Sequence, residues 1–83
     1  MNDAKEQIKV SDLGCASLLV TLQFNLVGLE RTSDEKRINF VFEKSDEVER
    51  VVNNFWADAE IAVPVQRLFQ NQRQLKNRLY AFK

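Results

Sequence analysis

The fold is decided by residues 38–56, INFVFEKSDEVERVVNNFW, where a strand pattern changes directly into a helix pattern. Alternate apolar residues at Ile38, Phe40 and Phe42 would occupy one face of a strand. After Ser45 the apolar residues recur at helical spacing, from Val48 to Trp56. A sheet face and a helix stripe of this kind must cover one another. The residues expected to share one core are Phe40, Phe42, Val52, Phe55, Trp56 and Leu68.

Length and composition are those of one globular domain. The chain has 83 residues, of which 45% are hydrophobic and 29% charged, with only two glycines and one proline. Its single cysteine, Cys15, cannot form an internal disulfide. The first residues lack the apolar run of a signal peptide, and the chain has no apolar run of about twenty residues that could span a membrane. We therefore expect a cytoplasmic protein that does not enter a membrane.

Before the deciding stretch, the sequence predicts a lead-in, a helix and a strand. Residues 1–10 are expected to form a flexible polar lead-in, with a single domain over residues 11–83. Ser11 or Asp12 can cap a helix that carries a mostly apolar surface through Val20. Gly14 in this helix indicates either a close backbone neighbour or a later helix start.

The segment 24–31, FNLVGLER, is expected to pair with residues 36–43 as an antiparallel hairpin, because the loop between them is short and polar. Gly28 within it indicates a bulge or close packing by Phe55 or Trp56. Residues 60–63 would form a third strand or an extended link that protects a sheet edge. Pro64 opens the last helix. The predicted class is α+β in two layers: helix, hairpin, helix, short link or third strand, and C-terminal helix.

Several of these landmarks resemble a family of small bacterial and phage proteins, domain of unknown function 5659. They are the strands LVGLE at 26–30 and FVFE at 40–43, the acidic helix that reaches Phe55 and Trp56, the Val63-Pro64 junction and the closing LKNRLY at 75–80. Members tend to have glycine where this chain has Gln23, and an acid where it has Val63. The family carries no established activity, so the resemblance implies a fold but no mechanism.

The residues themselves argue against an enzyme. The chain has no histidine, so Cys15 has no imidazole base and a zinc site of the usual spacing cannot be built. Neither a glycine-rich phosphate loop nor a nucleophile elbow occurs. We therefore predict no catalytic residues, no cofactor and no metal, which leaves binding as the expected function.

Charge is divided unevenly along a chain whose net charge is zero. Residues 43–60 hold six acids and two bases, whereas residues 61–83 hold five bases and no acid. One hypothesis is therefore a nucleic-acid-binding accessory protein, of phage or mobile-element type, that uses the basic last helix. The alternative for these charges is attraction between the two segments or simple solvation. The residues expected to contact nucleic acid are Arg67, Asn71, Gln74 and Arg78.

The favoured hypothesis is a protein-interaction or self-associating module. A domain of this size cannot cover all of its apolar residues, and exposed ones form binding patches. The partner would be an unidentified protein, or a second copy paired through an open sheet edge. The residues expected to form the interaction patch are Val27, Leu29, Tyr80 and Phe82.

Overall fold

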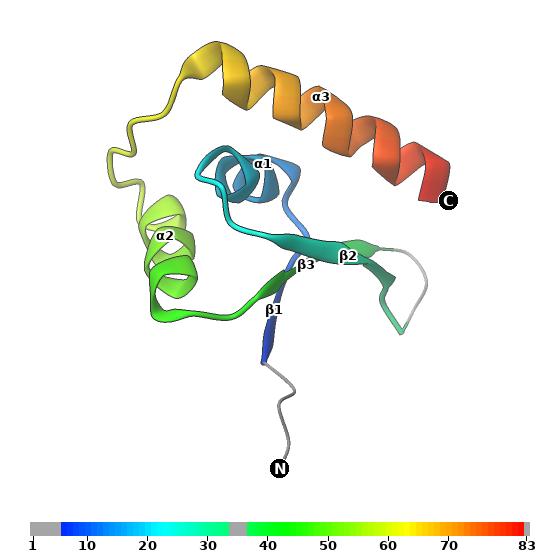
Figure 1. Cartoon of the computed structure of the whole chain (residues 1–83). Helices are drawn as coiled ribbons and strands as arrows, with labels where there is room; N and C mark the ends of the chain where they lie inside the picture. Colours follow the sequence, from blue (N-terminus) through cyan, green and yellow to red (C-terminus); the bar gives the residue numbers. More distant parts are fainter. Residues whose placement is uncertain (1–5, 34–36, 83) are drawn as a thin grey trace.

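The computed structural model describes residues 6–33 and 37–82 and confirms the α+β class. Its three strands are β1 (Gln7–Val10), β2 (Leu26–Arg31) and β3 (Ile38–Glu43). Its three helices are α1 (Leu13–Thr21), α2 (Asp46–Trp56) and α3 (Val65–Phe82). In Figure 1, α1 lies over the sheet, with α2 to one side and α3 above it.

Strand β3 is the centre of the sheet. The strand order is β1-β3-β2, and both pairings are antiparallel, so the predicted hairpin of β2 and β3 is confirmed. Strand β1 was not expected. Its residues 7–10 belong to the predicted flexible lead-in, and that part of the prediction is wrong because Val10 is buried opposite Phe40. Residues 1–5 of the predicted lead-in lie outside the described residues.

The connection between α2 and α3 contains no strand, so of the two alternatives for residues 60–63 the third strand is wrong and the link is confirmed. Ile61 and Val63 instead line a hollow together with residues of α1. They therefore cover the helices and not the edge of the sheet. The third strand comes from the other end of the chain, because β1 pairs with the free side of β3.

A bulge in β2 explains the spacing of its leucines. Leu26 is opposite Phe42 and Leu29 is opposite Phe40, with a shift of register between them. Regular alternation would put residues three apart on opposite faces, but the extra residue returns Leu29 to the inner face. Gly28 marks this bulge, as one interpretation predicted. The other interpretation, close packing on Gly28, is wrong, since a Cβ there would meet nothing within 4 Å.

Two side-chain caps set the starts of α1 and α2. Asp12 Oδ1 accepts a hydrogen bond of 2.8 Å from Cys15 N, and Ser45 Oγ accepts one of 3.1 Å from Val48 N. The Asp12 cap also explains Gly14, where a Cβ would lie 3.1 Å from the same Asp12 oxygen. Of the two expectations for this glycine, a close neighbour is confirmed, whereas a later helix start is wrong, because α1 begins at Leu13 directly after its Asp12 cap.

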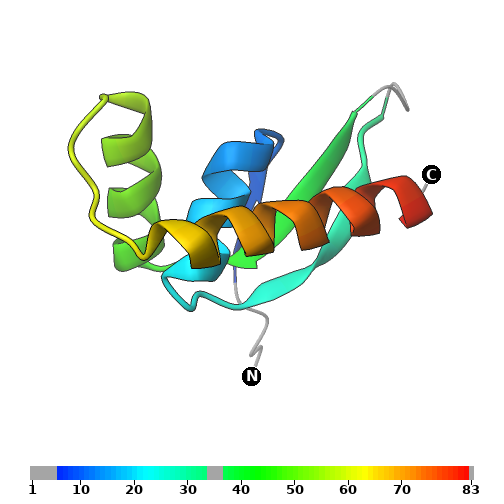
Figure 2. The ribbon, with the colours of Figure 1, turned by 90° about the horizontal axis from the view of Figure 1, so that it is seen from above.

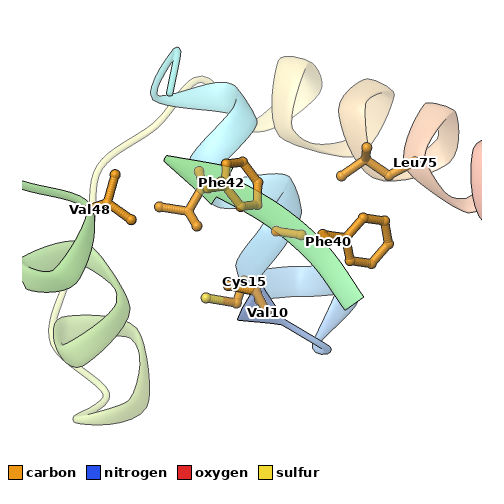
Figure 3. Packing of buried hydrophobic residues seen from close by; sticks show 8 residues of the cluster. Val10, Cys15, Phe40, Phe42, Val48 and Leu75 are labelled. Carbon is orange, nitrogen blue, oxygen red and sulfur yellow. The ribbon is translucent and has the colours of Figure 1, made fainter. Parts of the chain in front are cut away.

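The core fills the inner face of the sheet around Phe40 and Phe42, which are 1% and 0% exposed (Figure 3). Val52 and Phe55 pack against it as predicted. Trp56, by contrast, is 64% exposed. It follows Val48 by eight residues, about 80° around the helix, so it lies on the flank of α2. Leu68 is half-buried beside α1, outside the core. The buried cluster is Val10, Cys15, Ala16, Leu19, Phe40, Phe42, Val48 and Leu75.

Both α1 and α2 end with a residue in the left-handed region. Gln23 has φ 73° and Asp58 has φ 61°. In the first case Phe24 N bonds to Leu19 O, and in the second Ala59 N bonds to Asn54 O, both at 3.0 Å. These 6→1 bonds close the helices in the manner usually associated with glycine. Gln23 is also the position at which the resembling family tends to have glycine.

We predict that Gln23→Gly stabilises the protein by about 0.5–1 kcal/mol, because glycine adopts this φ without the steric cost that glutamine has. Gln70→Gly, in the exposed interior of α3, is the matched control and should destabilise by about 1 kcal/mol. Urea unfolding followed by far-UV circular dichroism measures both. A loss of stability with Gln23→Gly would contradict the described helix end.

We predict that Phe42→Ala lowers the free energy of unfolding by about 3–5 kcal/mol, because the ring is fully buried at the centre of the sheet. Trp56→Ala serves as the control and should cost less than about 1 kcal/mol, since most of the indole is exposed. Urea unfolding followed by far-UV circular dichroism suits both variants. Equal costs for the two substitutions would contradict the core described here.

Candidate interaction surface

The three helices leave an open corner above the first half of α1. Helix α3 packs mainly on α1 and crosses it, whereas α2 lies beside α1 and scarcely touches α3 (Figure 1 and Figure 2). The corner is bounded by the end of α2 and by the part of α3 between Leu68 and Leu79. Its floor is the beginning of α1, which includes Leu13 and Gly14.

Three hollows adjoin in this corner. One of about 420 Å³ lies between Gly14, Phe55 and Gln72, among others. A second of about 440 Å³ lies between Leu13, Trp56 and Leu79, and a third of about 370 Å³ is lined by Leu13, Phe69 and Gln72 with two cations. Leu13 and Gln72 are each shared by two hollows, so the three form one concave region. We call it the corner surface, defined by Leu13, Phe55, Trp56, Phe69, Gln72 and Lys76.

Large apolar side chains stand exposed on the rim of the corner surface. Trp56 is 64% exposed on one side, and Phe69 is 55% exposed on the other. Val65 and Tyr80, also exposed, lie within about 60° of Phe69 around α3. The interaction patch expected from the sequence did not include Leu13, Trp56 or Phe69. A signal existed for α3, since Val65, Phe69 and Tyr80 form a second apolar stripe beside the one that packs inward.

The charges around the corner surface are mainly basic on the wall formed by α3. Arg73 and Lys76 line the third hollow and are exposed. On the opposite side, Asp58 and Glu60 are exposed in the connection that follows Trp56. In residues 6–33 and 37–82, none of the ion pairs recorded joins α3 to α2 or to this connection. Asp58 and Glu60 therefore do not pair with Arg73 or Lys76 within the described part of the chain.

The predicted nucleic-acid residues are only partly brought together. Arg67, Gln74 and Arg78 are exposed on the flank of α3 opposite Phe69. Asn71 is half-buried, and its Nδ2 donates a hydrogen bond of 2.9 Å to Thr21 Oγ1 on α1. Its place in the predicted contact set is therefore wrong, because Asn71 joins the two helices.

The predicted interaction patch is not one surface. Leu29 packs against the core from the inner face of β2, so its place in the patch is wrong. Val27, Tyr80 and Phe82 are exposed. The Arg31 guanidinium lies 5.3 Å from the centroid of the Phe82 ring and donates a hydrogen bond to Phe82 O. Val27 is four residues before Arg31, about 13 Å along the strand, so it does not adjoin Phe82.

An ion pair between β1 and β2 crosses the outer face of the central strand β3. Lys9 Nζ of β1 lies 3.0 Å from Glu30 Oε1 of β2, on either side of the central strand. Lys9 is paired with Val41, and the crossing side chains help to explain why Val41 is only 5% exposed. The pair is half-exposed and contributes about 1 kcal/mol or less. Its role is to cover an apolar side chain as much as to join charges.

Cys15 lies in the core and is suited to packing. Its side chain is fully buried, and burial together with the nearby Asp12 carboxylate raises the pKa of the thiol to about 11. At neutral pH the sulfur is therefore protonated, whereas a nucleophile or metal ligand needs the thiolate. In the described residues, no three Cys, Asp or Glu side chains are placed to hold a metal ion. Of the described helices, none has the length and apolar character needed to cross a membrane.

The comparisons with known proteins give one match. The model of the family described as Domain of unknown function (DUF5659) matches residues 5–81. No curated protein and no solved structure matches the chain.

Proposed function

We propose that this chain, which belongs to the family Domain of unknown function (DUF5659), is a protein-interaction module that binds through the corner surface. The partner would be a protein surface on which carboxylates surround apolar side chains. One observation carries the proposal: Trp56 and Phe69 are each more than half exposed on the two rims of a concave region. Exposed apolar groups gathered around hollows are characteristic of protein-binding sites.

The chemistry of the surface supports a protein as the ligand. Aromatic side chains and arginine are the residues most enriched at the centres of protein interfaces. The basic wall formed by Arg73 and Lys76 favours a partner with acids around its apolar contacts. Leu13 and Gly14 form the floor between the rims, and a helix or a projecting side chain of the partner would lie against them.

Peptide selection tests this proposal. We expect displayed helical peptides selected on the protein to be rich in Asp, Glu and aromatic residues. Phe69→Ala should weaken their binding about tenfold or more, because it removes a rim side chain. Val27→Ala is the matched control, an exposed apolar residue on β2 whose loss should change affinity less than about twofold. Binding titrations by fluorescence anisotropy measure both. Peptides that depend on Val27 and not on Phe69 would contradict the proposed surface.

A second candidate function, nucleic-acid binding, is supported by the exposure of Arg67, Gln74 and Arg78 on one flank of α3. Residues 67 and 78 are eleven apart, so they share a face of the helix and could meet phosphates of one backbone. Two observations weaken this candidate: Asn71 is directed toward α1, and the net charge of the chain is zero.

A titration of labelled protein with short duplex and single-stranded DNA at low salt tests this candidate. If α3 binds nucleic acid, amide chemical shifts change along residues 67–78. The double substitution Arg67→Ala with Arg78→Ala then lowers the magnitude of the slope of log affinity against log salt concentration by about two. Arg73→Ala with Lys76→Ala is the control pair and should leave the slope unchanged. Absence of shifts in α3 below about 100 µM protein would remove nucleic acid as a ligand.

A further inference from the structure

We infer that the protein seated on the corner surface is a second copy of this chain, in a two-fold symmetric dimer. This inference rests on the proposed function and names the partner. In the dimer, Trp56 of each copy enters the hollow lined by Leu13, Phe69 and Gln72 of the other. A two-fold interface is self-complementary, so each copy must offer both a projecting group and a hollow. The corner surface offers both.

The first argument is geometric. Leu13 lines the hollow beside Trp56 and also the hollow beside Phe69. It therefore lies between the projecting Trp56 and the hollow that would receive Trp56 of the other copy. A two-fold axis that passes beside Leu13 brings both exchanges into place at once. The hollow beside Phe69, at about 370 Å³, has room for an indole ring.

The second argument is charge complementarity within a single sequence. The connection after Trp56 carries Asp58 and Glu60, and the wall of the receiving hollow carries Arg73 and Lys76. Insertion of Trp56 therefore carries two carboxylates toward two cations of the other copy, and symmetry repeats the contact. Within one copy, the described residues show no ion pair between these groups. Zero net charge adds no long-range repulsion between copies.

The third argument is area. A stable dimer interface buries about 800 Å² on each copy, which is about an eighth of the 6050 Å² surface of this chain. The corner surface extends across parts of all three helices. Its two rims carry the exposed apolar side chains Trp56 and Phe69, and its hollows are lined by both apolar and charged side chains. Contact across both rims at once is what an interface of this size requires.

Charge reversal tests the dimer. In sedimentation equilibrium, the average molecular mass should rise with protein concentration from the monomer value to the dimer value. Arg73→Glu with Lys76→Glu should raise the dissociation constant about tenfold or more, as should Asp58→Asn with Glu60→Lys. Asparagine is chosen at 58 because it tolerates the positive φ of that residue. Arg67→Glu with Arg78→Glu, the same charge change on the other flank of α3, is the control and should change the constant less than about threefold.

Mixing the two reversed variants gives a sharper result. In the mixed dimer, the acidic α3 of one copy meets the basic connection of the other, and both contacts regain opposite charges. The equimolar mixture should therefore dimerise about tenfold more tightly than either variant alone. Trp56 is the only tryptophan and is exposed in the single copy. Its fluorescence emission should therefore shift to the blue as the dimer forms. The protein concentration at the midpoint of this shift should equal that at the midpoint of the increase in mass.

Two results would overturn the inference. A mass that stays at the monomer value up to about 1 mM would remove the dimer, since a specific interface of this size binds more tightly. A dimer that survives both charge reversals, with unchanged Trp56 emission, would place the contact elsewhere, such as the sheet edge formed by β1. In either case, selected peptides that depend on Phe69 would still support the corner surface as a protein-binding site. Their absence would remove the proposed function as well.

Discussion

Burial of Phe40 and Phe42 on the central strand is the interaction on which the rest of the structure depends. Strand β3 pairs with both other strands, and its inner face receives the core residues of α1, α2 and α3. A sheet of three strands offers only a narrow face, which α1 and α2 largely occupy. Helix α3 therefore rests mainly on another helix. That helix is too short to cover it: nine residues span about 14 Å, whereas the eighteen of α3 span about 27 Å.

The exposed apolar residues lie on helix flanks that no other element covers. The inward stripe of α3, with Leu68, Leu75 and Leu79, is buried or half-buried along its length. The second stripe beside it, with Val65, Phe69 and Tyr80, remains exposed. Trp56 is exposed for the same reason, since it lies on the flank of α2. The corner surface is thus a consequence of how three helices meet over a small sheet.

Much of the fold could be predicted because local patterns determine it. The alternation of Ile38, Phe40 and Phe42 and the helical spacing after Ser45 indicated β3 and α2, and the residue types indicated a cap at Ser11 or Asp12. Strand β1 could not be identified from four residues with two aliphatic side chains. It becomes a strand because the free edge of β3 supplies the hydrogen bonds and the core supplies the contact with Val10. That is tertiary information, which a short window does not contain.

The interaction surface was predicted less well, for a related reason. Which flank of an amphipathic helix is buried depends on the angle at which it crosses its neighbours. The spacing of apolar residues within one helix does not determine that angle. Trp56 was assigned to the core because the apolar stripe of α2 includes it, yet it lies about 80° from Val48, the most buried residue of that helix. Asn71 was assigned to solvent because it is polar, yet it bonds Thr21 across the contact of α1 and α3. Residue type alone misplaced both side chains.

The division of charge acquires a physical meaning only with the fold. In the sequence, an acidic segment followed by a basic one suggests two neighbouring helices that attract each other. In the structure, α2 and α3 diverge from their connection and scarcely touch. Exposed charges separated by more than about 8 Å are largely screened at physiological salt, so the division contributes little to the stability of one copy. Opposite charges on diverging helices can act on binding only when another surface brings them together, and in the dimer that we infer that surface is a second copy of the chain.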